Sequence, residues 1–279
     1  MRIDSHQHFW KLDRGDYRWM SPALTKLYKD YLPTELLPQL AKHRIDRTIV
    51  VQAADTVEET EFLLQLAAEN DFIAGVVGWL DLESPEFARQ FDHFRRNPKF
   101  LGLRPMLQDL PDDAWITRPS VLRSLRIIAE ADFPFDFLTH PRHLPYVLEA
   151  LDKVGPMRGV IDHLSKPEIK QHVLEPWKDL LKQTAQHESM YCKLSGMITE
   201  ADHDHWIAED LRPYVNHAVD CFGWDRVIFG SDWPVCLLAG SYDQVVDGLR
   251  EVLGTRMDAA AERKVFGLNA MTFYKLNPR

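Results

Sequence analysis

The stretches Ile3-Asp4-Ser5-His6-Gln7-His8 and Val227-Ile228-Phe229-Gly230-Ser231-Asp232 lie at opposite ends of the chain, and both are typical of short strands that end in polar groups. His6 and His8 are two residues apart, so in a strand their side chains project from the same face. Asp232 ends the last strand-like run. A closed barrel of parallel strands brings the ends of its first and last strands side by side. The two stretches therefore predict a barrel with a site at its mouth.

Strand-like and helix-like patterns alternate along the whole chain. Strands are expected near residues 2–8, 46–53, 73–80, 99–106, 133–140, 157–163, 189–195 and 226–232. Amphipathic segments such as Glu58–Asn70, Leu144–Val154 and Tyr242–Leu253 lie between them. Eight strand-plus-helix units close a (β/α)8 TIM barrel. We therefore expect a single α/β domain over residues 1–279, with an extra helix near Ala259–Leu276 that packs against the outside of the barrel.

Two connections, after strands one and four, are too long to be plain links. Residues 9–33 carry several aromatic side chains, including Trp10 and Trp19, and residues 107–119 carry a cluster of aspartates. Both segments follow strand ends, where barrel enzymes build their sites. We interpret them as lid or substrate-binding insertions. The alternative is that the aromatic side chains only cap the rim of the barrel.

Composition excludes several classes of protein. The net charge of −9 argues against a nucleic-acid or anionic-membrane surface. No apolar run approaches the length of a membrane span, and the first residues do not resemble a signal peptide. The three cysteines lack metal-finger or redox spacing, which favours a reducing, cytoplasmic setting. The expected partner is a small molecule, and the oligomeric state stays open.

Asp232 and the His6-x-His8 pair are the strongest candidates for chemistry. A carboxylate at the closed end of an apolar strand is costly unless it has partners or a task. Asp232 could bind a metal, accept a proton from water, or do both; the structural alternative is a helix N-cap. A second pair, His203-x-His205, lies in an acidic stretch with no strand to direct it, so we interpret it as a surface feature.

Two further histidines end strands. Alternation along strand six lets only one of Asp162 and His163 face the barrel interior, and we favour His163, with Asp162 buried or at the rim. A neutral imidazole there could hydrogen-bond a reacting carbonyl or bind a metal. His140 ends strand five and fits a further metal ligand, although the Pro141-Arg142 that follows leaves open an outward orientation.

Two cations lie in strand-like runs. An inward-facing Lys193, in strand seven, requires a carboxylate or a substrate oxygen, because an unpaired ammonium inside a barrel is costly. Arg104 ends strand four, where its planar guanidinium could hold a carboxylate or several hydroxyls. For both residues a purely structural ion pair is the alternative.

These motifs, taken together, resemble those of the amidohydrolase superfamily. Within it the whole chain is similar to the amidohydrolase 2 family of metal-dependent TIM-barrel hydrolases, in the branch that contains sugar-lactone hydrolases. The resemblance is carried by Asp4-Ser5-His6-Gln7-His8-Phe9-Trp10, Gly102-Leu103-Arg104, Pro141-Arg142-His143-Leu144-Pro145, Asp162-His163-Leu164-Ser165-Lys166-Pro167, Cys192-Lys193-Leu194-Ser195-Gly196, Phe229-Gly230-Ser231-Asp232-Trp233-Pro234 and Asn269-Ala270-x-x-Phe273-Tyr274.

The resemblance implies a hydrolase that opens a lactone of an aldonic acid, such as a fucono-, rhamnono- or galactono-lactone. It implies a metal or a water at His6 and His8, Asp232 as general base, and His163 as a ligand or a carbonyl-polarising group. Strand four offers Arg104 and no lysine, so the bridging lysine of two-metal members is missing. We therefore expect one divalent ion, zinc, with His6, His8, Asp232 and His140 as candidate ligands; a metal-independent enzyme stays open.

The expected mechanism starts with Asp232, which removes a proton from the water that attacks the lactone carbonyl. The metal, or His163 and Lys193 in its absence, would hold the oxyanion. Substrate hydroxyls would be oriented by four side chains: Arg104, Lys193, Trp10 and Trp19. The same barrel and ligands also support an alternative function, a zinc-dependent decarboxylase of an unsaturated or aromatic acid.

Overall fold

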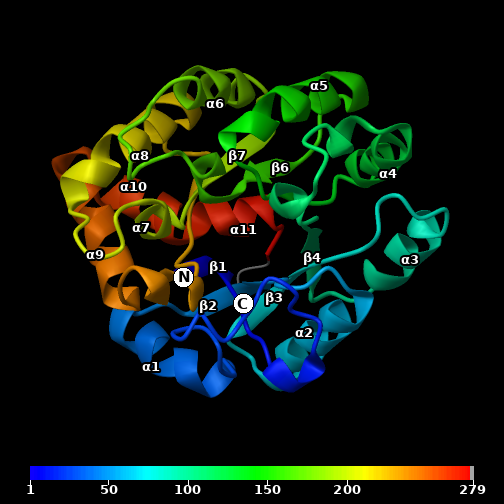
Figure 1. Cartoon of the computed structure of the whole chain (residues 1–279), viewed down its shortest axis with the longest axis horizontal. Coiled ribbons are helices and arrows are strands. Elements are labelled where there is room, and N and C mark those ends of the chain that lie inside the picture. Colours follow the sequence, from blue (N-terminus) through cyan, green and yellow to red (C-terminus); the bar gives the residue numbers. More distant parts are fainter. Residues whose placement is uncertain (277–279) are drawn as a thin grey trace.

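Eight parallel strands form the inner wall of a barrel, and helices surround it (Figure 1). The structure, a computed structural model, describes residues 1–276. The strands pair in chain order from the first to the eighth. They are β1 (Ile3–Gln7), β2 (Arg47–Val51), β3 (Ile73–Gly78), β4 (Phe100–Leu103), β5 (Phe135–Phe137), β6 (Gly159–Ile161), β7 (Met190–Leu194) and β8 (Val227–Phe229). The predicted TIM barrel is confirmed, and each strand lies within its expected run.

The helices cover the outside of the strands and bury their apolar faces against them. They are α1 (Pro33–His43), α2 (Val57–Glu69), α3 (Phe87–Phe94), α4 (Pro119–Glu130), α5 (Leu144–Val154), α6 (Trp177–Ala185), α7 (Met197–Glu200), α8 (Ala208–Phe222), α9 (Tyr242–Leu253), α10 (Ala259–Arg263) and α11 (Asn269–Phe273). The amphipathic segments expected from the sequence correspond to α2, α5 and α9. None of the helices within residues 1–276 is both long and apolar enough to cross a membrane.

The barrel closes between β1 and the segment that follows β8. The Asp232 N–H donates to the His6 carbonyl at 2.8 Å, and the His8 N–H donates to the Trp233 carbonyl at 2.7 Å. The buried Asp4 carboxylate accepts the Ser231 N–H at 2.9 Å, next to these two bonds. These bonds pair the two segments residue by residue. Closure of the barrel therefore places Asp232 beside His6 and His8.

The C-terminal helices differ from expectation. A π-helical turn, Lys264–Leu268, joins α10 to α11. Ala270, Phe273 and Tyr274 belong to a buried cluster with side chains of five strands, Ile3, Ile49, Ala74, Val160 and Ile228 among them. The Tyr274 hydroxyl also reaches Asp136 of β5 at 3.1 Å. The expectation that this segment packs against the outside of the barrel is therefore wrong for its last part, because Ala270, Phe273 and Tyr274 join a buried cluster of strand side chains.

The insertion after β1 folds back on itself. Trp10 pairs with Tyr31 through two backbone hydrogen bonds of 3.0 Å, which close the segment into a loop. The Trp10 ring then packs edge-to-face against Trp19 and Tyr31.

The insertion after β4 contains two short 3-10 turns, Leu107–Asp109 and Trp115–Thr117. Both segments lie at the carboxyl ends of the strands, as expected of site-forming insertions.

Replacing Asn269 with Ala is expected to lower the free energy of unfolding by about 1–3 kcal/mol. Its buried amide donates to the Trp224 and Val227 carbonyls at 2.7 and 2.8 Å and so ties α11 to the start of β8. Urea unfolding measures the change, with the exposed Thr272→Ala as control. Equal stabilities of the two variants would show that this link contributes little.

Candidate functional site

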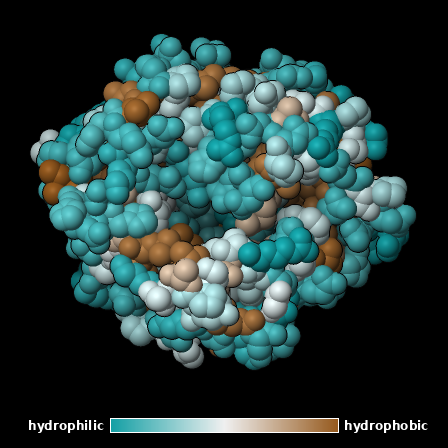
Figure 2. All heavy atoms as spheres, viewed as in Figure 1, coloured by the Kyte–Doolittle hydropathy of each residue, from teal (hydrophilic) through white to brown (hydrophobic). Residues whose placement is uncertain are grey.

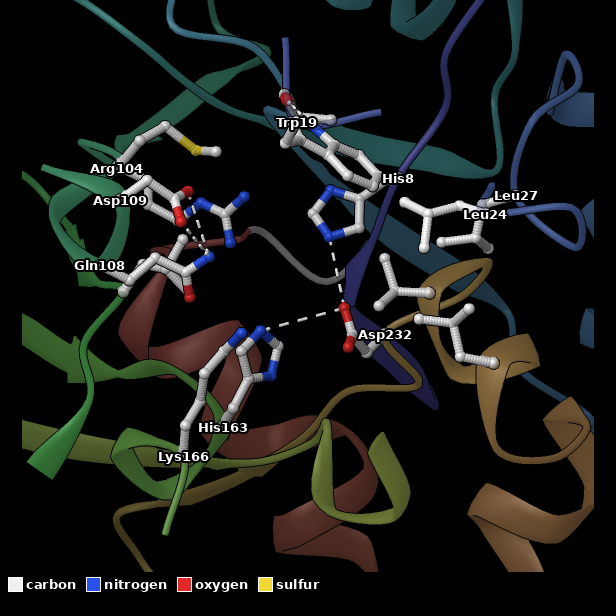
Figure 3. A pocket seen from close by; sticks show the side chains of 15 residues that line it. His8, Trp19, Leu24, Leu27, Arg104, Gln108, Asp109, His163, Lys166 and Asp232 are labelled. Carbon is white, nitrogen blue, oxygen red and sulfur yellow. Dashed lines mark hydrogen bonds and ion pairs between the residues drawn. The ribbon is translucent and has the colours of Figure 1, made fainter. Parts of the chain in front are cut away.

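Three ligand atoms from β1 and from the segment after β8 converge at the mouth of the barrel. The Nε2 atoms of His6 and His8 are 3.2 Å apart. Asp232 Oδ1 lies 3.3 Å from His8 Nε2 (Figure 3) and 3.7 Å from His6 Nε2. All three side chains are at most 5% exposed. The sequence prediction that Asp232 faces the two histidines therefore agrees with the geometry.

Local backbone geometry makes this convergence possible. Asp232 has a φ of 56°, a left-handed conformation that is uncommon for a residue other than glycine. Gly230, two residues earlier, lies so close to His6 that a Cβ atom would come within 2.6 Å of the His6 Cβ. Any side chain at Gly230 would therefore push His6 out of place.

The three side chains fit a divalent metal ion. Tetrahedral zinc with ligand distances of 2.0–2.1 Å requires ligand atoms about 3.3 Å apart, close to the spacings observed here. His8 Nδ1 donates to the Val51 carbonyl at 2.8 Å, so its Nε2 carries the lone pair that a metal needs. Burial, and then the charge of Lys193, hold the pKa of His6 well below its usual range, which keeps this imidazole neutral. Two imidazoles and one carboxylate would fill three of the four positions of tetrahedral zinc, so the fourth would be left for a substrate.

Charge around the three ligands also favours a cation. Buried carboxylates are contributed by Asp136, Asp162 and Asp232, and buried cations by Arg104 and Lys193. Arg104 and Lys193 pair with Asp136 and Asp162, so among these five groups the Asp232 carboxylate is the one that lacks a pairing with Arg104 or Lys193. A buried charge is stable only when it is compensated, so a metal ion next to Asp232 would complete the balance.

Lys193 is fully buried next to His6 and does not line the open pocket. Its fully buried ammonium is held by Asp136, lies 3.1 Å from Asp162 Oδ1, and is 3.2 Å from His6 Nδ1. These partners satisfy the requirement for carboxylates that its position in β7 predicts. The ammonium is fully buried and does not line the cavity, so the expected contact with substrate oxygens stays a prediction.

Asp162 and His163 both face the site, which corrects the expectation that only one of them could. Val160 and then Asp162 follow the inward alternation of β6, and Asp162 pairs with Arg104 Nη1 at 3.3 Å. The strand ends at Ile161, and the chain then enters a left-handed turn. This turn redirects His163 to the pocket, 3.9 Å from Asp232 Oδ1. The alternation argument failed because it assumed that the strand continues.

The left-handed turn consists of four consecutive non-glycine residues. His163, Leu164, Ser165 and Lys166 have φ values of 52°, 54°, 61° and 49°. Each such residue costs on the order of 1–2 kcal/mol, and runs of them are rare. Surrounding groups hold the turn in place.

Three residues of the turn, His163, Leu164 and Ser165, have fixed neighbours. Trp177 donates its indole N–H to the Leu164 carbonyl at 2.6 Å, and the Ser165 hydroxyl bonds Thr139 at 2.8 Å. His163 Nδ1 bonds the Ser195 hydroxyl at 2.8 Å. Gly196, at φ 64°, leaves room for the His163 ring, because a Cβ there would lie 2.6 Å from Nδ1. The strained conformation is therefore held from several sides.

Electrostatics prepare the site for proton transfer. Burial alone would raise the pKa of Asp232, but His163 and His8 outweigh it and hold the pKa of this carboxyl below its usual range. Burial holds the pKa of His163 well below its usual range, although Asp232 opposes the shift. At neutral pH the site therefore combines a carboxylate that can take a proton with a neutral imidazole that can donate or accept a hydrogen bond.

A cavity of about 230 Å³ opens above these groups, and Figure 2 shows a hollow near the middle of the same face with hydrophobic residues beside it. One wall is apolar and the opposite wall is polar. The lining residues are His8, Trp19, Leu24, Leu27, Ala53, Arg104, Met106, Gln108, Asp109, Leu138, His163, Lys166, Asp232, Val235 and Leu238. The two insertions identified from the sequence contribute Trp19, Leu24, Leu27, Gln108 and Asp109.

Two other expected site residues do not reach this cavity. Trp10 is fully buried behind Trp19, and its indole N–H donates to the Lys29 carbonyl at 2.8 Å, so its role is to fix the insertion. His140 lies in a neighbouring cavity and is not part of the His6, His8 and Asp232 group. Its chain turns outward at Pro141, the alternative that the sequence left open. Arg104 and Trp19 do line the cavity, as expected.

The end of β2 positions three of the site side chains and was missed by sequence reasoning. Three consecutive backbone carbonyls accept a hydrogen bond each. The Val51 carbonyl accepts from the His8 ring, and the Gln52 carbonyl accepts from the Arg104 guanidinium. The Ala53 carbonyl accepts from the Trp19 indole. Glu59 of α2 fixes this segment, since its carboxyl accepts the Ala53 N–H at 2.9 Å. The only signal in the sequence was a charged residue on the apolar side of an amphipathic helix.

Replacing Glu59 with Gln is expected to change how stability depends on pH. Burial raises the pKa of Glu59 from its ordinary 4.5 to about 8. Between these values unfolding releases a proton, so rising pH destabilises the native protein by up to about 1.4 kcal/mol per pH unit. The stability of the wild type relative to Glu59→Gln should therefore fall from pH 5 to pH 8 in urea titrations. A constant difference, like that expected for the exposed Glu58→Gln, would contradict this account.

Comparisons with known proteins agree with this geometry. The family model described as "Amidohydrolase" matches residues 3–276. A protein of Burkholderia ambifaria named L-fucono-1,5-lactonase is 40% identical, with 99% of this chain and 96% of the relative covered. One of the same name from Burkholderia multivorans is 37% identical over 99% of this chain and 96% of its own length.

The comparison of structures gives the same result. A crystal structure of a Burkholderia multivorans amidohydrolase with bound zinc superimposes with a TM-score of 0.93 at 37% identity, and covers 99% of this chain and 100% of the other. The matched region spans the whole barrel, from β1 to the C-terminal helix. The chain therefore belongs to the amidohydrolase family.

Proposed function

We propose that the protein hydrolyses the lactone of a sugar acid, with L-fucono-1,5-lactone and related aldonolactones as the substrate class. The observation that carries this proposal is the position of Asp232 at the floor of the cavity, between His8 and His163. The names of two relatives at 37–40% identity over nearly the whole chain support the choice of substrate. A relative named L-rhamnono-gamma-lactonase, 26% identical over 63% of this chain, supports it further.

The two walls of the cavity suit a sugar lactone. Arg104, Gln108 and Asp109 offer hydrogen-bond donors and acceptors for hydroxyl groups. Leu24, Leu27 and Leu238 on the apolar wall can contact the C–H face of the ring. Trp19 closes the top of this wall and is held in place by its bond to the Ala53 carbonyl at 2.7 Å.

In this proposal His6, His8 and Asp232 hold one zinc ion, since nitrogen and carboxylate ligands at these spacings suit zinc. When bound, the ion would act as a Lewis acid on the lactone carbonyl and would lower the pKa of a bound water. The bound zinc in the related crystal structure supports the choice of metal.

The chain's own residues perform the proton transfers. The Asp232 carboxylate takes a proton from the attacking water while the oxygen of that water bonds the carbonyl carbon of the lactone. In this proposal the Ser195 hydroxyl, 2.8 Å away, donates to His163 Nδ1, which leaves the Nε2–H of His163 to donate to the carbonyl oxygen as negative charge develops. When the carbonyl re-forms, the ring C–O bond breaks and the proton on Asp232 passes to the ring oxygen.

Replacing Asp232 with Asn is expected to lower lactone turnover by about 10²–10⁴-fold, because the amide cannot accept the proton. Turnover is measured with a pH indicator on a panel of aldonolactones, with Asp204→Asn, an exposed residue, as the control. A variant that folds and turns over lactones at the wild-type rate would remove Asp232 from the mechanism.

Removal of the metal by chelation and dialysis is expected to lower turnover in proportion to the metal lost, and one equivalent of zinc should restore it. The expectation follows from the two histidine Nε2 atoms and the Asp232 carboxylate that face one point. Full activity of metal-free protein would instead support the metal-independent mechanism. A protein that decarboxylates unsaturated acids but leaves all lactones intact would favour the alternative function.

A further inference from the structure

Lys166 is the last residue of the left-handed turn, and its side chain points into the cavity beside His163 (Figure 3). The side chain is 20% exposed, so it is largely enclosed but still reaches solvent. It lines both the cavity above Asp232 and an adjoining cavity of about 760 Å³ that includes Glu200 and Lys170. Lys166 therefore forms the boundary between the reaction site and a more open, polar space.

The partners of Lys166 do not explain its position. The carboxylate recorded near its ammonium, Glu200 Oε1, is 3.7 Å away, beyond hydrogen-bond distance. Partly exposed ion pairs of this kind contribute little to stability. Trp177, Thr139 and Ser195 hold the first three residues of the turn. The weak ion pair with Glu200 does not account for the direction of the Lys166 side chain, and strained turns of this kind cluster at functional sites.

The other two cations near the reacting centre are already engaged. Lys193 is fully buried under His6 with Asp136 and Asp162. Arg104 donates to the Gln52 carbonyl and lies 3.3 Å from Asp162. Among the lining residues of the cavity, Lys166 is thus the cation whose donors remain available to a substrate.

We propose that Lys166 is a catalytic residue that donates a hydrogen bond to the ring oxygen of the lactone as that oxygen leaves. The role rests on the proposed lactone hydrolysis. When the tetrahedral intermediate collapses, the electron pair of the breaking C–O bond moves to the ring oxygen. The ammonium stabilises this charge and keeps its own proton, and the oxygen then takes the proton carried by Asp232.

The test compares Lys166→Met with Lys166→Arg, Lys166→Ala and a matched control, Lys170→Met. Lys170 lies four residues further on, is 56% exposed, and lines only the outer cavity. Lys166→Met should lower kcat by about 10²–10³-fold with little change in KM, because the charge it stabilises exists only in the transition state. Lys166→Arg should recover part of the loss, ethylammonium should partly rescue Lys166→Ala, and metal content should stay constant in all variants.

Each outcome decides the proposal. Wild-type protein that turns over no aldonolactone would overturn the proposed function, and this role with it. Active wild type with Lys166→Met within threefold of it would overturn the role of Lys166 alone. Three further results would show a structural role and would equally overturn the proposal. The first is that Lys170→Met lowers kcat as much as Lys166→Met does, and the second is that the loss of kcat in Lys166→Met comes with a loss of metal. The third result is that ethylammonium fails to restore activity to Lys166→Ala.

Discussion

The hydrogen bonds that close the barrel between β1 and the segment after β8 are the constraint on which the site depends. Asp232 N–H to the His6 carbonyl and His8 N–H to the Trp233 carbonyl fix two chain segments more than 200 residues apart in one register. The same bonds set the Asp232 carboxylate opposite two imidazoles. Stability and site geometry therefore have a common origin, because an error in closure would also separate the proposed ligands.

Above this closure the site contains unfavourable elements that the barrel stabilises. A left-handed turn from His163 to Lys166 is strained, and five charged side chains are buried. Trp177 and Ser195 hold the turn, while Arg104 and Lys193 pair with Asp136 and Asp162 and leave Asp232 facing the imidazoles. Such compensation indicates that the arrangement serves chemistry, since an apolar core would be cheaper to fold.

Much of this could be predicted from the sequence, since apolar strand-like runs and the polar residues that end them are local signals. They sufficed for eight strands, for the meeting of His6, His8 and Asp232, and for Arg104 and Trp19 in the cavity wall. What could not be predicted depends on where a strand stops. Alternation allowed only one of Asp162 and His163 to face the site, which failed because β6 ends at Ile161, and it gave no sign that Lys166 enters the cavity. The buried position of Trp10, the pairing of Lys193 and the outward turn at His140 likewise depend on tertiary packing.

Anomalous diffraction from crystals of the protein at the zinc absorption edge tests the central claim most directly. The account predicts one peak at about 2.0–2.2 Å from His6 Nε2, His8 Nε2 and the Asp232 carboxylate. Two results from zinc-supplied crystals would contradict it. The anomalous map could show no peak at that point, or it could show a peak only at a surface group such as His203 and His205.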